Sequence, residues 1–219
     1  MKTAKKLLMT AVVTTFVALS AGTAEAAQLR FTAKGEDSGI ENATERNKFF
    51  KLNFQEGPDN VYIKKFVFDL SPDANAIFDF TSGSPGGKGF PFEVSQNSDI
   101  TDADIKKYFL SEDKQKLTVK FVDEAFSVGE ILKFGVDTDR IAGGGKVDDG
   151  GDFGIADIKF KVTLSNGTKG KGVFEKKDPL KSVAIANITD PQPVPEPATI
   201  LGLFAVSGLG AFSLKRSRH

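Results

Sequence analysis

Apolar and polar side chains alternate with a period of two residues along most of the chain, which is the pattern of half-buried β-strands. Each alternating segment has one apolar and one polar face, as in antiparallel sheets with a solvated side. Turn-forming Gly, Pro, Asn and Asp separate the segments. We expect eight or nine strands in an all-β, antiparallel β-sandwich of jelly-roll or Ig-like type. The clearest segments are residues 28–33, 50–54, 65–70, 116–121, 132–137 and 157–164.

Two local signals refine this expectation. Asn166-Gly167 predicts a β-hairpin that joins residues 158–164 to a strand near 171–175. Residues 102–109 are expected to form a short helix that Thr101 or Asp102 caps. Because acids at a helix start stabilise its free amides, Asp99, Asp102 and Asp104 are interpreted as capping residues and not as a glycosidase pair.

The composition narrows the possible chemistry. Twenty Phe against two Tyr and no Trp favour a Phe-packed core over an aromatic binding surface. The chain has no Cys, which excludes disulfides, thiol nucleophiles and zinc–thiolate sites. Its only histidine is His219, the last residue, so the folded domain offers no histidine base. We therefore expect that the protein is not an enzyme.

The net charge is zero overall, but residues 27–190 alone carry 27 acidic and 23 basic side chains. A mildly acidic domain lacks the basic patch that nucleic acid or an anionic membrane surface attracts. Nucleic acid is therefore not an expected partner.

The N-terminal 26 residues have the three parts of a secretory signal peptide. Lysines come first, an apolar run follows at residues 7–21, and Ala24 and Ala26 form the small-residue cleavage pattern. Residues 1–26 are thus predicted to be removed during export by the general secretion machinery, which leaves residues 27–190 as the β-sandwich domain.

The C-terminal end also has three parts. Alternating prolines make residues 191–197 an extended linker. Residues 198–214 are uncharged and apolar, at the lower length limit for a transmembrane helix. Residues 215–219 form a basic tail, in which Lys215, Arg216 and Arg218 are expected to stay in the cytoplasm.

This ending resembles the PEP-CTERM sorting signal, through Val194-Pro195-Glu196-Pro197, the Gly-rich apolar stretch after it and the basic tail. The resemblance implies an exported protein of a Gram-negative bacterium that makes extracellular polysaccharide. It implies processing by exosortase, a membrane-embedded enzyme, with Pro195, Glu196 and Pro197 as the recognition motif. Before that processing, the C-terminal helix would anchor the chain in the inner membrane. The alternative is a tail anchor that is never cut.

Residues 126–167 are, more weakly, similar to a stretch common in cyanobacterial proteins with this tag. That similarity implies a shared sandwich and no known activity.

One Gly-rich segment between two strands is strongly acidic. Carboxylates and backbone carbonyls are the oxygen ligands that Ca²⁺ prefers, and glycines let carbonyls turn inward. The segment does not match an EF-hand, because Ile141 and Ala142 stand where that loop needs a ligand and a glycine. A solvated acidic loop is the simpler interpretation, and Ca²⁺ binding is the competing hypothesis. The candidate ligands are Asp137, Asp139, Asp148, Asp149 and Asp152.

These observations favour a cell-surface or extracellular-matrix protein with a structural or adhesive role. The alternative is a surface module that binds polysaccharide or calcium. No other cofactor is expected, and the mature protein belongs in the cell envelope or outside the cell.

Overall fold

The computed structural model describes residues 26–36, 38, 47–80, 82–84, 87–140 and 149–189. Ten strands in this part of the chain form one continuous sheet, and every strand pairing in it is antiparallel. The order across the sheet is β7-β10-β2-β1-β14-β13-β12-β3-β9-β8. Its strands are β1 (Ala26–Lys34), β2 (Phe50–Glu56), β3 (Ile63–Asp69), β7 (Glu93–Val94), β8 (Ile105–Leu110), β9 (Lys116–Phe121), β10 (Ile131–Gly135), β12 (Lys159–Leu164), β13 (Lys169–Asp178) and β14 (Lys181–Thr189).

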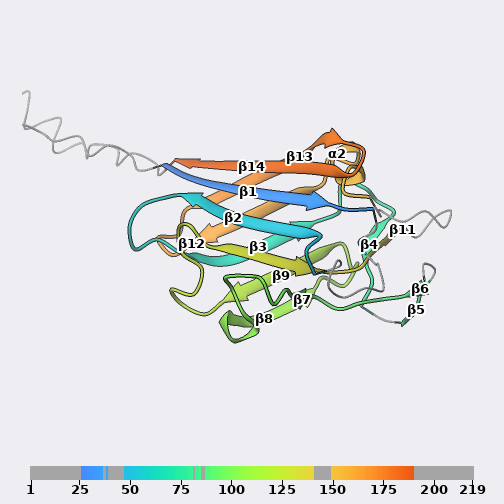
Figure 1. Ribbon diagram of the computed structural model, residues 1–219, viewed down its shortest axis with the longest axis horizontal. Helices are drawn as coiled ribbons and strands as arrows, with labels where there is room; N and C mark the ends of the chain where they lie inside the picture. Colours follow the sequence, from blue (N-terminus) through green and yellow to red (C-terminus); the bar gives the residue numbers. More distant parts are fainter. Residues whose placement is uncertain are drawn as a thin grey trace, which may run out of the picture.

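Smaller elements complete the described structure (Figure 1). Two short strand pairs stand apart from the main sheet, and the helical elements are a single 3-10 turn and one turn of α-helix. They are β4 (Ala76–Phe78) with β11 (Thr138–Arg140), β5 (Ser82–Ser84) with β6 (Gly87–Lys88), η1 (Asp102–Asp104) and α2 (Asp152–Ile155).

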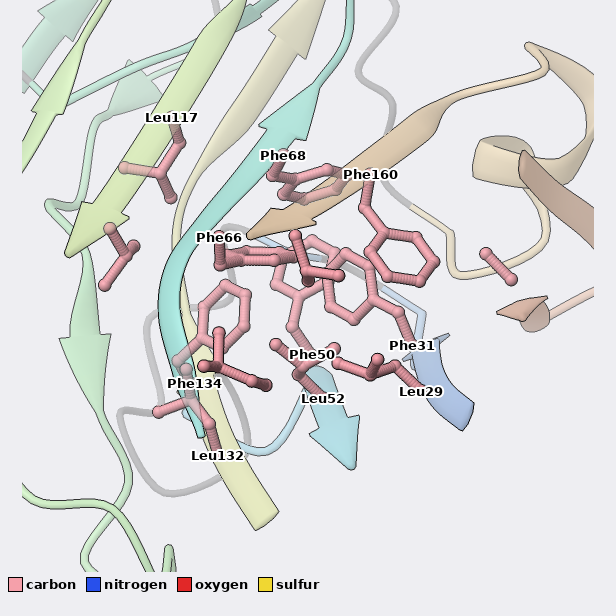
Figure 2. Close-up of a cluster of buried hydrophobic side chains, with 14 of the residues drawn as sticks. Leu29, Phe31, Phe50, Leu52, Phe66, Phe68, Leu117, Leu132, Phe134 and Phe160 are labelled. Carbon is pink, nitrogen blue, oxygen red and sulfur yellow. The ribbon is translucent and has the colours of Figure 1, made fainter. Parts of the chain in front are cut away.

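The sheet curls around a core made mainly of phenylalanine. Phe31, on the central strand β1, has its ring centroid 5.1 Å from that of Phe66 and 4.9 Å from that of Phe68, both on β3. Phe134 of β10 lies 6.2 Å from Phe66, although β10 and β3 are far apart in the strand order. Figure 2 shows these rings converging from strands on different parts of the sheet. The Phe-filled core predicted from composition is confirmed.

The all-β, antiparallel expectation is confirmed, and the predicted strands are present with shifted ends. The sandwich is not confirmed, because ten of the described strands join into one curled sheet. The hairpin at Asn166-Gly167 is confirmed: Gly167 has φ +86°, Asn166 accepts a hydrogen bond from the Thr168 amide at 3.0 Å, and β12 pairs with β13 on either side.

The helix expected at residues 102–109 is wrong beyond its first turn. Only Asp102–Asp104 is helical, and Ile105–Leu110 is the outer strand β8 paired with β9. Ile105, Tyr108 and Phe109 have the i, i+3, i+4 spacing of a helical apolar stripe, but in the structure the side chains of residues 105–110 are exposed or half-buried. Backbone pairing with β9 therefore prevails over helix formation.

The first and the last described residues of the folded body lie side by side. Ala26, the first residue of β1, pairs with Thr189, the last residue of β14. Cleavage after Ala26, as predicted, would leave Ala27–Lys34 to form the strand. Figure 1 shows the β4–β11 pair at the opposite end of the molecule.

Candidate metal centre

The β4–β11 pair brings acidic side chains together through its register. Thr138 pairs with Phe78, and continuing that register by one residue places Asp79 opposite Asp137. The Asp79 amide donates a hydrogen bond to the Asp137 carbonyl oxygen at 3.0 Å, which fixes this pairing. Asp139 follows Asp137 by two residues and so points to the same face of its strand. The three carboxylates therefore share one side of the pair.

We call Asp79, Asp137 and Asp139 the acidic cluster. One carboxylate oxygen from each residue lies within 4.8 Å of one from each of the others. All three side chains are buried, with exposed fractions of 0%, 5% and 3% respectively. In the part of the chain that the structure describes, this is the one group of three acidic or histidine side chains arranged to hold a metal ion.

The backbone around the acidic cluster is held from several sides. The Phe78 amide donates to the Lys114 carbonyl at 2.8 Å, and the Asp137 amide donates to the Phe90 carbonyl at 3.3 Å. The Phe78 ring packs on Phe68 of the core, with centroids 5.3 Å apart. These contacts tie both strands of the pair to the rigid Phe core, so the carboxylates cannot easily move apart.

One oxygen of each cluster carboxylate is sealed from solvent and accepts no hydrogen bond: Oδ2 of Asp79, Oδ1 of Asp137 and Oδ1 of Asp139. Each of the three residues also has other interactions within the chain. Elsewhere in the protein, a single buried carboxylate is satisfied by hydrogen bonds and an ion pair. Asp69, 3% exposed, accepts hydrogen bonds from the Ser71 amide and hydroxyl and lies 3.5 Å from the Lys161 ammonium.

The predicted calcium ligands divide into three cases. Asp137 and Asp139 do come together, as part of the acidic cluster. Asp148 lies outside the described residues. Asp149 and Asp152 are described, and the structure does not bring them into the acidic cluster.

The reason is that the segment after Asp149 docks elsewhere. The Gly150 amide donates to the Gly35 carbonyl at 3.0 Å, and the Gly154 amide donates to the Ser182 hydroxyl at 2.9 Å. A Cβ at Gly154 would lie 2.1 Å from the backbone nitrogen of Lys176, so α2 presses directly on β13. This close packing, which only glycine permits, fixes Asp152 against β13 and β14.

Asp79 was missed by sequence reasoning because it is far from the other two acids along the chain. A signal was nevertheless present: Asp79 stands in the apolar run Ala76-Ile77-Phe78-Asp79-Phe80. A carboxylate inside such a run is either exposed on an otherwise buried strand or buried with a compensating charge.

The second acidic group agrees with its prediction in part. The Asp104 carboxylate accepts hydrogen bonds from the Thr101 amide at 2.8 Å and the Thr101 hydroxyl at 2.7 Å, which caps the 3-10 turn. Asp99 instead accepts a hydrogen bond at 3.0 Å from the Ile131 amide, at the start of β10. The capping role is therefore seen for Asp104, and for Asp102 it stays a prediction.

A groove of about 840 Å³ lies where the two outer strands of the curled sheet approach each other. Phe92, Glu93 and Val94 line one wall, at and before β7, and Ile105, Lys107 and Tyr108 of β8 line the other. Tyr108 is 42% exposed, and its ring centroid is 5.1 Å from that of buried Phe92. The groove thus combines an accessible aromatic ring with charged side chains.

Asn47 adds a polar atom to this groove. It is among the lining residues, and its side-chain oxygen Oδ1 is buried and accepts no hydrogen bond.

The predicted targeting residues lie outside the described residues. They are Ala24 of the signal cleavage site, Pro195, Glu196 and Pro197 of the sorting motif, and Lys215, Arg216 and Arg218 of the basic tail. Among the residues that the structure does describe, no helix has the length and apolarity needed to cross a membrane.

A family model of the PEP-CTERM protein-sorting motif matches residues 193–217. The match confirms the resemblance seen at the C-terminus, while the individual roles of Pro195, Glu196 and Pro197 stay predictions. No curated protein and no solved structure matched the chain.

Proposed function

We propose that this chain, whose C-terminal motif indicates an exported protein sorted by exosortase, has a structural or adhesive role at the cell envelope or in the extracellular matrix. The match to the sorting motif at residues 193–217 is the observation that carries the proposal. The proposal assigns no catalytic activity to the folded domain.

The arrangement of the body supports such a role. Because Ala26 pairs with Thr189, the linker that follows leaves the body beside the predicted signal cleavage site. A protein held at that end presents its opposite end, with the β4–β11 pair, away from the attachment point (Figure 1). A body built on a Phe core also needs no disulfide for stability outside the cell, and the chain has no cysteine.

The sorting step is tested by replacing Pro195-Glu196-Pro197 with three alanines in a host that carries exosortase. The unprocessed chain should accumulate in the inner membrane, as the unaltered chain should in a host without exosortase. Replacing Pro191-Gln192 with two alanines is the matched control, since it alters the linker and spares the motif. Mass spectrometry of the mature C-terminus reads out both variants. Normal processing of the triple-alanine variant would contradict the proposal.

The structural or adhesive role is tested separately, by removing the gene and measuring cell aggregation and attachment. We expect both to fall, and to recover with the unaltered chain but not with the triple-alanine variant. Unchanged attachment in the deletion strain would count against this role and leave the sorting result standing.

The groove between β7 and β8 favours a second candidate, a surface module that binds extracellular polysaccharide. Sugar rings stack on accessible aromatic faces, and their hydroxyls pair with polar side chains. Tyr108 offers the ring. Lys106 and Lys107 line the groove together with Glu93 and Asp102, so charged side chains of both signs are available to sugar hydroxyls.

A pair of neighbouring aromatic residues tests this candidate. Tyr108→Ala should weaken binding to the host's purified extracellular polysaccharide by roughly tenfold or more, as loss of a central aromatic anchor does. Phe109→Ala is the matched control, because Phe109 is 44% exposed on the same strand but does not line the groove. Equal binding by the unaltered chain and both variants would eliminate the groove as a glycan site.

A further inference from the structure

One face of the curled sheet carries a concentration of lysines. The four neighbouring strands β13, β12, β3 and β9 (Figure 1) hold ten lysines against three acidic residues, although residues 27–190 as a whole are mildly acidic. The net charge of the domain therefore conceals a local excess of positive charge. We infer that this face binds a linear acidic polysaccharide. The inference depends neither on the structural or adhesive role nor on the groove between β7 and β8.

Strand register brings five of these lysines to the same side of the sheet. Lys65 of β3 pairs directly with Lys120 of β9, and Lys161 of β12 pairs directly with Lys171 of β13. Val67, two residues after Lys65, pairs with Lys161 and so joins the two lysine pairs. Paired residues of neighbouring strands project to one face, as do residues two apart on one strand. We call this set the lysine track: Lys65, Lys120, Lys161, Lys169 and Lys171.

The lysine track is built against the electrostatic preference of a sheet. Like charges directly opposite each other on neighbouring strands are destabilising, and the track contains two such pairs. Among the described residues, Asp69 is the only one whose carboxylate forms an ion pair with a track lysine, at 3.5 Å from Lys161. Glu175, the next acid along β13, pairs instead with Lys177 at 2.7 Å. An anion bound over the track would relieve repulsion that the protein itself leaves in place.

A shallow hollow of about 370 Å³ lies among the track lysines, and four of the five line it. Between them the hollow is lined by the shorter residues Val67, Thr163 and Gly170. Lysine stems are apolar below their charged ends, so they and Val67 offer a surface to the apolar face of a sugar ring. The Thr163 hydroxyl can exchange hydrogen bonds with sugar hydroxyls, while the ammonium groups attract acidic groups of the sugar.

The spacing of the track favours a polymer whose charges repeat regularly. One row in direct register crosses β9, β3, β12 and β13, and neighbouring strands lie about 4.8 Å apart. The residues of this row are Lys120, Lys65, Thr163 and Lys169. Sugar units of an extended polysaccharide repeat at a similar distance, so successive acidic sugars can meet successive strands. The sorting motif indicates an exported protein, which meets such polymers outside the cell.

Two other anionic partners fit the track less well. Proteins that bind single-stranded nucleic acid stack its bases on aromatic rings set among their basic residues, and the lysine track includes no aromatic residue. Proteins that bind a membrane surface push apolar side chains into the lipid beside their basic residues. Val67, the apolar side chain within the track, is half-buried in its floor. The track therefore suits a polymer that lies on the surface.

The test uses the full chain held in nanodiscs of phosphatidylcholine, with empty nanodiscs as the blank. Polygalacturonate is the probe, because it is linear and carries a carboxylate on each sugar unit. Dextran, a neutral polysaccharide, is its control. Biolayer interferometry should show binding to polygalacturonate that weakens as NaCl is added, since salt screens exposed charges. Dextran should give no signal.

Charge-matched double variants locate the binding. Lys65→Gln with Lys171→Gln takes one lysine from each opposed pair and should weaken binding roughly tenfold. Lys34→Gln with Lys51→Gln removes the same charge from β1 and β2 and should bind like the unaltered chain. Lys65→Arg with Lys171→Arg keeps the charge and should keep most of the affinity. Thermal unfolding followed by circular dichroism should show that the track variant is at least as stable as the unaltered chain, because it loses repulsion.

Several results would overturn the inference. They are no binding to polygalacturonate, equal binding to dextran, and equal effects of the two glutamine double variants. A comparable loss of binding in Tyr108→Ala would place the polysaccharide in the groove and not on the track. Tighter binding to DNA, or to vesicles of phosphatidylcholine and phosphatidylglycerol, would overturn the identity of the partner.

Discussion

The chain holds two groups of three aspartates that look alike in sequence and differ completely in the fold. Asp99, Asp102 and Asp104 lie at the surface, where Asp104 accepts two hydrogen bonds from Thr101 and Asp99 accepts one from the Ile131 amide. Asp79, Asp137 and Asp139 are buried, and their oxygens converge within 4.8 Å. In the first group, water and nearby amides stabilise each charge separately. In the second, three charges lie close together away from water, and each of the three residues also has other interactions within the chain.

The difference shows that the chemistry of an acidic cluster depends on how deeply its carboxylates are buried and how closely they approach. The number of acids alone does not determine it. The difference also separates two sources of stability. The surface group contributes through local hydrogen bonds. The buried group depends on the core that holds both strands of the β4–β11 pair in place. The following predictions test this separation.

The largest effect is expected for Phe78→Ala. Phe78 is fully buried beside Asp79 and packs on Phe68, so its loss leaves a cavity under β4. We expect a loss of about 3–5 kcal/mol in the free energy of unfolding, measured by denaturant titration. Phe109→Ala, at an exposed ring, should change stability by about 0.5 kcal/mol or less. Equal stability of the two variants would mean that the contact between Phe78 and Phe68 does not hold β4 in place.

The next largest effect is expected for Gly154→Ala. Its new Cβ would lie 2.1 Å from the Lys176 backbone nitrogen and force α2 away from β13. We expect about 1–3 kcal/mol of destabilisation, seen in denaturant unfolding. Ile155→Ala, at an exposed position of the same helix, is the control and should change the stability little. A Gly154→Ala variant as stable as Ile155→Ala would show that α2 does not press on β13.

A smaller effect is expected at the surface group. Asp104→Ala removes the acceptor for the Thr101 amide and hydroxyl, and loss of such a cap costs about 1 kcal/mol. Chemical denaturation measures this loss. Asp102→Ala on the same turn is the control, and we expect little change from it. Equal stability of the two variants would mean that the hydrogen bonds from Thr101 to Asp104 do not stabilise the turn.

The smallest effect concerns a third, single surface aspartate. The Ser111 hydroxyl and the Gln115 amide both donate to Asp113, and these hydrogen bonds hold the pKa of the Asp113 carboxyl below its ordinary value of 3.8. A lowered pKa in the folded state means that the stabilisation is present above pH 3.8 and disappears as the pH falls through the lowered pKa. NMR titration of Asp113 should show this, and Ser111→Ala should move the pKa back toward its ordinary value. An unmoved pKa in that variant would assign the shift to another cause.

Much of the fold could be inferred from local pattern. The alternation at Phe160, Val162 and Leu164 gave β12, and Asn166-Gly167 gave the turn into β13, because both depend on neighbouring residues alone. The short helix was wrong after Asp104 because β8 gains its hydrogen bonds from β9, a partner that local pattern does not reveal. The curl of the sheet could not be predicted from local pattern either. It depends on ring contacts between residues distant in the chain, such as Phe31 with Phe66 and Phe134 with Phe92.

For the candidate site, the sequence pattern identified Asp137 and Asp139 but grouped them with acids that are near in the chain. Asp149 and Asp152 were near in the chain, yet close packing at Gly150 and Gly154 fixes their segment against other strands. Asp79 was distant in the chain, yet strand register sets it opposite Asp137.

The amino-acid order alone thus revealed the strand-forming segments, the Phe-rich interior and the C-terminal sorting motif, because periodicity, composition and short motifs are properties of contiguous residues. Which carboxylates meet, and whether water reaches them, was decided by the folded chain. The carboxylates come together and are buried because of strand register and packing between distant segments. Neither register nor packing can be read from the order of neighbouring residues.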